Sequence, residues 1–446
     1  MLPSELWLRI FEIAARWDPL HVDIEFLRED KRNRVLLALA YTCRQWLPLA
    51  LHILYREIFL SGWDYHDEEG RYCAGTRLPM KRLVSTLSLL TARRSALPRT
   101  VQVLHVAIGR YQYPSSSYDY CLHCDFVSVA EAVSLCPAMR HLSLRVHCEP
   151  TGHTWSIPPA AIRIFTKADN IEQLTYSDQQ DTQVLDRLRT IAAMRAAAAS
   201  GSDFATYAVS PSLKPLFQLV SVSRGLRYLE VETSDADGSG GLSALSHANL
   251  EEFRLRMKGR QHPAPTPLHH LLDGAPALSA VVLSDAGPGQ VYALPRRIKS
   301  LLLRGPEVAL DLRDFHSLTH LGIEFPIYEE IHKSPALDTF ARLPESLTHL
   351  TLYGEHNEHN LPVTAYSPRD DFSMQELLRS EIFRAHVQRL SHVQQWTIVV
   401  DPDVSLRVPD ALSKPSRAAN RLSLHVVQMA SRPWEKVKRP MPRHVS

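Results

Sequence analysis

The chain has 446 residues, 45% of them hydrophobic and 22% charged, which is the composition of a folded water-soluble protein with more than one compact core. No run approaches the roughly 18 apolar residues that a membrane helix needs, and 50 basic residues against 48 acidic ones give no strong basic excess. We therefore expect neither a membrane nor a nucleic acid among the partners of this protein.

Residues 1–60 predict three helices. Pro3 suits the first turn of a helix, where its missing N–H has no use, and Leu6 and Ile10 then recur at helical spacing with other apolar residues. So many apolar positions leave little of the first helix for water, which indicates contact on more than one side. The third helix is expected to lead into a short strand, and an acidic loop with a linker helix follows over residues 61–98.

The N-terminus does not read as a secretory signal, because Glu5, Arg9 and Glu12 interrupt its apolar stretch. We therefore expect an intracellular protein, in the cytoplasm, the nucleus or both. Six cysteines in so long a chain do not form a disulfide scaffold, and an intracellular location keeps them reduced.

From about residue 100 onwards, one local pattern returns: an apolar residue, two variable residues, an apolar residue, one variable residue and a further apolar residue. Segments 317–323 and 346–352 are nearly identical copies, so chance is a poor explanation. The period-two ending predicts a short strand, and the first apolar residue packs the turn before it. The copies lie at 101–106, 139–144, 171–176, 226–231, 250–255, 278–283, 298–303, 318–323, 347–352 and 393–398, with a further strand expected at 422–426.

This pattern is typical of the strand half of a leucine-rich repeat, in which each repeat adds one strand to a curved parallel sheet. The spacing between copies runs from 20 residues (278 to 298) to 55 residues (171 to 226), so the array is irregular and carries insertions. The Asn or Cys of the regular repeat is mostly missing. Candidate helices between the strands lie at 127–135, 160–168, 337–343 and 373–390.

The expected fold is therefore α/β: a small three-helix unit over residues 1–60, then an irregular leucine-rich-repeat solenoid with a curved parallel sheet. The repeat domain is expected over residues 99–428. Residues 429–446 are basic, rich in proline and short of apolar anchors, so they are expected to form a flexible tail.

The chain opens with Leu2-Pro3-Ser4-Glu5-Leu6, Ile10 follows four residues on, and residues 43–46 read Cys-Arg-Gln-Trp. These two motifs, in this order, resemble the start and the end of an F-box of the fungal type. The resemblance in motif covers residues 2–60, and the rest of the chain matches only as an architecture, an F-box followed by irregular repeats. Residues 16–33 form a longer connection than the compact family pattern has.

The resemblance implies a substrate-recognition subunit of a Skp–cullin–F-box ubiquitin ligase. The F-box would bind the Skp adaptor, and through it a cullin, while the repeat domain would hold a target protein for degradation. Three short helices offer too small a core to use every apolar side chain internally, and surplus apolar surface marks an interface. For Leu6, Ile10 or Trp46 taken singly, the alternative to an adaptor contact is a place in the core of the helical unit. The adaptor-facing residues that the resemblance implies are Leu2, Pro3, Leu6, Ile10, Phe11, Leu36 and Trp46.

Catalytic motifs are not found in the sequence. It has no phosphate-binding loop, no dinucleotide-binding glycine pattern, no nucleophile elbow and no metalloprotease helix motif. We therefore expect a non-catalytic protein without a cofactor. The alternative to a ligase subunit is a leucine-rich-repeat scaffold that acts outside a ubiquitin ligase, and an enzyme with a site hidden in the repeat insertions comes third.

Cys121 and Cys124 are spaced like one half of a zinc site. The second half is poorly spaced, because His141 and Cys148 lie on either side of a predicted strand. We therefore expect no bound metal, a cysteine pair in a loop between repeats, and other cysteines that act as small apolar fillers.

In each repeat strand, the variable residue between two apolar ones points to the exposed face of the sheet. Such a residue can contact a target protein, or it can simply face solvent. Arginine and tyrosine are enriched at binding hot spots, and the local set Arg254, Arg256 and Arg304 is placed to face an acidic or phosphorylated segment. The candidate target-binding residues are Arg145, Glu230, Arg254, Arg256, Arg304, Glu324 and Tyr353.

Overall fold

The residues that the computed structural model describes are 3–16, 25–60, 77–109, 122–147, 156–179, 214–233, 249–257, 272, 274–284, 291–292, 294–304, 309–324, 335–353, 381, 385, 389–390, 392–400 and 423–428. They belong to two compact units. The first comprises residues 1–251 with 257–259 and 270–277, and the second comprises 252–256, 260–269 and 278–446. The boundary falls inside the predicted repeat region.

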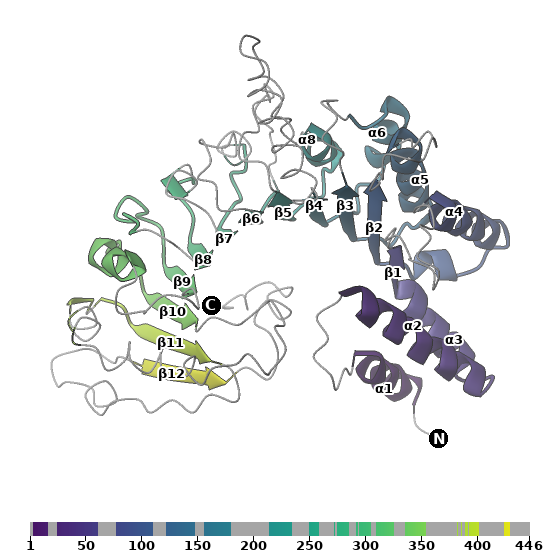
Figure 1. The fold of residues 1–446 in the computed structure, drawn as a ribbon, viewed down its shortest axis with the longest axis horizontal. Helices are drawn as coiled ribbons and strands as arrows, with labels where there is room; N and C mark the ends of the chain where they lie inside the picture. Colours follow the sequence, from purple (N-terminus) through teal and green to yellow (C-terminus); the bar gives the residue numbers. More distant parts are fainter. Residues whose placement is uncertain are drawn as a thin grey trace, which may run out of the picture. The chain divides into compact units, whose positions relative to one another are not determined.

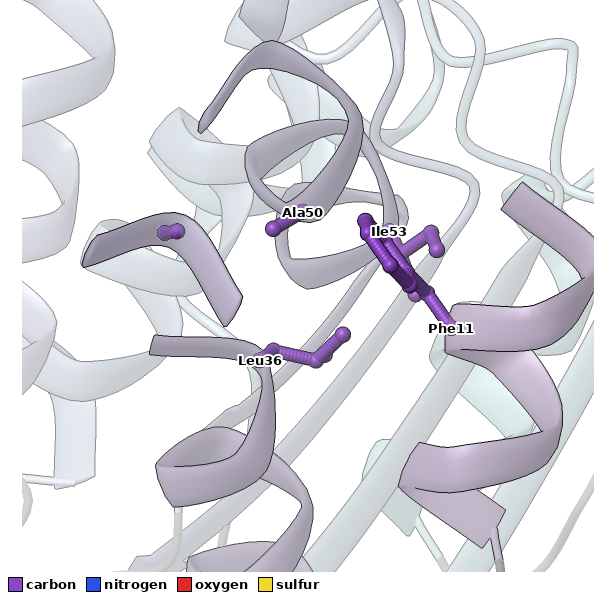
Figure 2. Packing of buried hydrophobic residues seen from close by; sticks show 5 residues of the cluster. Phe11, Leu36, Ala50 and Ile53 are labelled. Atoms are coloured by element: carbon purple, nitrogen blue, oxygen red, sulfur yellow. The ribbon is translucent and has the colours of Figure 1, made fainter. Parts of the chain in front are cut away.

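Three helices open the first unit: α1 (Ser4–Arg16), α2 (Glu25–Thr42) and α3 (Leu47–Arg56). Their shared core is small and consists of Phe11, Leu36, Ala40, Ala50 and Ile53, four of which are labelled in Figure 2. Pro48 lies in the first turn of α3, where a helix tolerates it. The backbone turns extended at Glu57, so α3 leads directly into the first strand, as the sequence predicts.

Five parallel strands follow one another in chain order in the first unit. They are β1 (Glu57–Leu60), β2 (Val103–Gly109), β3 (His141–His147), β4 (Gln173–Gln179) and β5 (Tyr228–Thr233). Helices α4 (Arg77–Ala92), α5 (Leu122–Leu135), α6 (Pro159–Phe165) and α8 (Lys214–Val222) lie in a row along one side of these strands (Figure 1). A short 3₁₀ helix, η1 (Leu97–Arg99), precedes β2.

The second unit repeats the arrangement of parallel strands. They are β6 (Glu252–Met257), β7 (Ala280–Ser284), β8 (Ser300–Arg304), β9 (His320–Glu324), β10 (His349–Tyr353), β11 (Gln395–Val400) and β12 (Ser423–Gln428). Between β9 and β10 the chain forms the 3₁₀ helix η3 (Pro335–Arg342), at the place where a helix was predicted over 337–343.

The strands occur where the repeat pattern predicts them, and the structure gives their register. The central apolar residues of successive copies lie opposite one another, as Leu104, Leu142 and Leu174 do on β2, β3 and β4. The two nearly identical segments pair in the same way, with Leu321 opposite Leu350. These leucines are buried, so each strand turns one set of alternate side chains into the core.

A recurring backbone motif joins one repeat to the next. Two consecutive N–H groups at the start of a strand donate to one carbonyl of the preceding repeat, as those of Arg140 and His141 do to Gln102. The N–H groups of Thr348 and His349 donate in the same way to Thr319. Because each turn satisfies the backbone of the next one, the repeats need little sequence identity to stack.

No helix in the described parts of the chain is both long and apolar enough to cross a membrane.

Candidate interaction surfaces

Exposed apolar side chains occur on all three N-terminal helices. Leu6 and Ile10 lie one turn apart on α1 and are 46% and 42% exposed. Leu37 and Tyr41 have the same spacing on α2, and Leu47 opens α3, all three being exposed. We call these five residues the exposed apolar set. Large apolar side chains in water cost free energy unless a partner covers them.

Leu6 and Ile10 are not part of the helical core, because an aromatic cluster fills the space between α1 and the start of α3. The rings of Trp7, Phe11 and Trp46 pack together, with centroids 4.9–5.9 Å apart. The clustered rings stabilise the packing of α1 beside the start of α3. The small core therefore closes on the aromatic face of α1 and leaves the Leu6 and Ile10 face to solvent.

The structure separates the seven residues that the resemblance implies as adaptor contacts. Leu6, Ile10 and Pro3 are exposed. Phe11 and Leu36 are core residues with 1% and 0% of their surface exposed, which corrects the expectation that they face a partner. Helical spacing places Phe11 on a neighbouring face to Ile10, and that face packs inwards.

Trp46 is half-buried in the aromatic cluster, and Leu2 lies outside the described residues. The sequence reasoning missed Leu37, Tyr41 and Leu47. The four-residue spacing of Leu37 and Tyr41 on α2 was the available signal.

The strands of the first unit present a second kind of surface. We call the side chains of β1–β5 that alternate with the buried ones the first strand face. On β1 and β2, Glu57 Oε1 lies 3.2 Å from His105 Nε2, and the ring of His105 stacks on Phe59 with centroids 4.3 Å apart. On β3 and β4, His141 Nε2 lies 3.1 Å from the hydroxyl of Thr175.

Two carboxylates on β5 complete the first strand face, and both accept hydrogen bonds from hydroxyl groups of β4. Thr175 donates to Glu230 at 3.4 Å, and Ser177 donates to Glu232 at 2.7 Å. Arg145 on β3 lies in the same row as Ser177 and Glu232. Burial lowers the pKa of Arg145, and the negative charge of Glu232 opposes that shift.

The corresponding second strand face, on β6–β12, holds paired charges. Arg254 and Glu252 form an ion pair at 2.5 Å on β6, and Arg304 on β8 lies 3.3 Å from Glu324 on β9. Tyr353 follows on β10, and burial is the main cause that raises the pKa of its hydroxyl, with the charge of Glu324 adding to it.

Apolar residues occupy the middle of the second strand face. Val282 and Leu302 hold positions where the alternation predicts exposure, yet both are buried. Gly322 is next in the row. A methyl group there would lie 2.6 Å from Leu302 Cδ1 and 3.2 Å from Tyr353 Cε2, so these side chains converge over the glycine.

Two histidines in register on β9 and β10 stack within the second strand face. The rings of His320 and His349 have centroids 4.2 Å apart and are nearly parallel. Nδ1 of each ring lies within 2.9 Å of the hydroxyl of the preceding threonine, Thr319 or Thr348. Each hydroxyl also donates to a carbonyl of the repeat before. Each threonine hydroxyl therefore lies between a histidine ring and the repeat before it.

All seven predicted target-binding residues therefore lie on the strand faces, Arg145 and Glu230 on the first and the other five on the second. The three arginines do not form a cationic set that awaits an acidic partner, because Arg254 and Arg304 each pair with a carboxylate of this chain. The sequence alone did not show that Glu252 and Glu324 pair with these arginines.

The cysteine pair considered for metal binding cannot be placed, since Cys121 and the side chain of Cys124 lie outside the described residues. Cys136 is buried at the end of α5, and burial raises the pKa of its thiol to about 12. Among the residues that the structure does describe, no three His, Cys, Asp or Glu side chains are grouped to hold a metal ion.

Comparison with solved structures finds similar chains, among them a leucine-rich-repeat protein. The leucine-rich repeat-containing protein LegL7 from Legionella pneumophila aligns over 72% of this chain and 91% of its own, with 14% sequence identity and a TM-score of 0.32. No protein family model matches the sequence. No curated protein matches it either. The class that the structure itself defines is a repeat protein of parallel strands, each in the register of a leucine-rich-repeat strand, with a small helical unit at its N-terminus.

Proposed function

We propose that this chain is the substrate-recognition subunit of a Skp–cullin–F-box ubiquitin ligase and has no catalytic residue of its own. Helices α1–α3 dock on the Skp adaptor, which connects the chain to a cullin, and the strand faces hold a target protein inside the cell. A receptor of this kind acts by proximity, because it raises the local concentration of the target near a ubiquitin-charged enzyme.

The observation that carries the proposal is the exposed pair Leu6 and Ile10. The two side chains belong to the opening motif that resembles an F-box, and they project from a helix whose other face is closed by Trp7 and Phe11. Covering such side chains contributes roughly 25 cal/mol for each Å² of apolar surface removed from water. Leu37, Tyr41 and Leu47 add exposed apolar surface on the neighbouring helices.

Binding to purified Skp adaptor tests the docking step. The double variant Leu6→Asp/Ile10→Asp places two charges on the exposed face and leaves the aromatic cluster intact, so the chain is expected to fold and to lose the adaptor. Leu89→Asp is the matched control, because Leu89 is 51% exposed on α4, outside the three-helix unit. It is expected to bind the adaptor as the natural protein does.

Circular dichroism of both variants checks that they are folded. The proposal fails if the natural chain does not bind the adaptor, or if the double variant and the Leu89→Asp control bind equally well.

A leucine-rich-repeat scaffold outside a ubiquitin ligase is the second candidate. The repeat strands favour it, because both strand faces are complete without any contribution from the helices α1–α3. Reconstituted ubiquitylation separates the two candidates. A chain that binds a partner on its strand faces but neither binds the adaptor nor promotes ubiquitin transfer to that partner is the scaffold.

A further inference from the structure

The two strand faces differ in charge. Among the described face positions, the charged residues of the first strand face are Glu57, Glu230, Glu232 and Arg145, three carboxylates against one guanidinium. Those of the second strand face are Arg254, Arg256, Arg304, Glu252 and Glu324, three guanidinium groups against two carboxylates. A partner that spans strands therefore meets a negative surface on the first unit and a nearly balanced one on the second.

The acidic residues Glu57 and Glu230 stand on the first and the last strand of the first strand face. Glu57 lies on β1 and Glu230 on β5. Ser143 and Thr175 occupy the central row, and both side chains are too short to cover the neighbouring strands. A polypeptide segment that crosses the face from β1 to β5 passes both carboxylates.

The guanidinium of this face lies on β3, between the strands that carry Glu57 and Glu230. Arg145 lies in the row of Glu232, and the charge of Glu232 acts on it directly. Glu230 receives a hydroxyl hydrogen bond from Thr175, and a neutral donor orients a carboxylate without cancelling its charge. At the other edge, Glu57 lies beside the flat stack of Phe59 and His105, and aromatic faces attract guanidinium and ammonium groups.

We propose that the first strand face binds a basic segment of the target, with one lysine or arginine at the Glu230 edge and another at the Glu57 edge. Four strand spacings separate β1 from β5, which is roughly 19 Å, or about six residues of extended chain. Side chains six residues apart in an extended segment point the same way, so both can face the sheet. This inference rests on the proposed function in one respect: the proposed function makes the bound segment part of a target protein.

Labelled synthetic peptides and the full-length chain test the proposal by fluorescence anisotropy. The probe is a 13-residue Ser/Gly/Ala peptide with arginines at positions 4 and 10, and its counterpart has glutamates at the same positions. The arginine peptide is expected to bind, to weaken as salt is raised and to outcompete the glutamate peptide. Equal binding of both peptides, or preference for the glutamate peptide, overturns the proposal.

Two matched charge reversals locate the binding surface. Glu230→Lys is expected to weaken binding of the arginine peptide at least about tenfold, because it replaces an attraction by a repulsion at one edge. Glu131→Lys makes the same change on the exposed side of α5, away from the strands, and is expected to change the affinity less than about twofold. Equal weakening by both variants would mean that only net charge is sensed, and would sink the proposal.

Two further measurements distinguish this proposal from a failure of the adaptor role and from binding of the chain's own basic segment. Binding of Glu230→Lys to the Skp adaptor is measured in parallel, so loss of the adaptor role and loss of peptide binding are distinguished. If deletion of residues 429–446 raises the peptide affinity, the chain's own basic segment competes for the face, and the assignment to a target is overturned.

Discussion

Gly225, in the turn before β5, has no room for a side chain. A methyl group there would lie 2.3 Å from the carbonyl oxygen of Asp169 and 3.3 Å from that of Ile171. Both obstacles are backbone atoms of the preceding repeat, so they cannot rotate away. We expect Gly225→Ala to lower the free energy of unfolding by about 1–3 kcal/mol in urea denaturation.

Gly322 is the internal comparison for that measurement. A methyl group there meets the end of the Leu302 side chain, which can change its rotamer. Gly322→Ala should therefore stay within about 1 kcal/mol of the natural protein. If it destabilises the chain more than Gly225→Ala does, the difference between backbone and side-chain obstruction is not what decides the cost.

Cys136 and Cys43 should differ strongly in reactivity. Burial raises the pKa of the Cys136 thiol to about 12, so at pH 8 only roughly one molecule in 10,000 carries the reactive thiolate. Cys43 is exposed in the turn between α2 and α3. We expect iodoacetamide at pH 8 to label Cys43 in the native protein and to spare Cys136 until denaturant is added.

Peptide-level mass spectrometry follows both sites in one sample. The sign of the shift can also be checked, because a raised pKa keeps the thiol neutral and labelling of Cys136 should rise only as the pH approaches 12. Rapid native labelling of Cys136 at pH 8 would show that the end of α5 opens.

At the scale of the element, the turn before each strand connects neighbouring repeats through side chains as well as backbone. The amide of Asn170 donates to the carbonyls of Pro137 at 2.8 Å and Met139 at 2.7 Å. Removing it leaves two carbonyls of the preceding turn without this donor. We expect Asn170→Ala to lower the free energy of unfolding by about 1–3 kcal/mol.

Asn249 offers a graded control for the Asn170 prediction. It is exposed and donates a single hydrogen bond, to the carbonyl of Arg224 at 3.0 Å. Asn249→Ala should cost no more than about 1 kcal/mol in the same urea titration. Equal costs at the two positions would indicate that the asparagines act through helix or turn propensity and not through the bonds they make.

The strands were predictable from sequence, and the turns between them were not. Alternating apolar residues such as Leu142 and Leu144 determine which side of a repeat strand faces the core, because a shift by one residue would expose the whole apolar set. Asn170 carries no such pattern: Gly225, Asn249 and Ser346 hold the same place in other turns, and residue types that differ this much do not reveal from sequence that Asn249 and Ser346 make a similar hydrogen bond.

The helical unit shows a second limit of sequence reasoning. Helical spacing separates the Leu6 and Ile10 face from the Trp7 and Phe11 face, but both are apolar, so the pattern does not say which one packs inwards. Contact with Trp46, far along the chain, decides it. The ion pair of Arg304 with Glu324 is likewise made 20 residues apart, between strands whose exact register only the structure shows.

At the scale of the whole molecule, stacked repeats imply that stability is local. Each strand pairs only with the strands before and after it within its unit, so the loss of one core side chain should weaken its own repeat and its neighbours first. Leu142 on β3 and Leu321 on β9 are buried, equivalent residues in the two units. Either Leu→Ala change should lower the free energy of unfolding of its own unit by about 2–5 kcal/mol.

Hydrogen exchange with mass spectrometry can show where that cost falls. Leu142→Ala should raise exchange in β2–β4 and leave β8–β10 close to the natural protein, and Leu321→Ala should do the reverse. The reciprocal pair is its own control, since both variants remove the same atoms from the same place in a repeat. Uniform loss of protection in both units from a single substitution would mean that the two units unfold as one cooperative body. Peptide binding at the first strand face would then depend on core residues of the second unit as strongly as on its own.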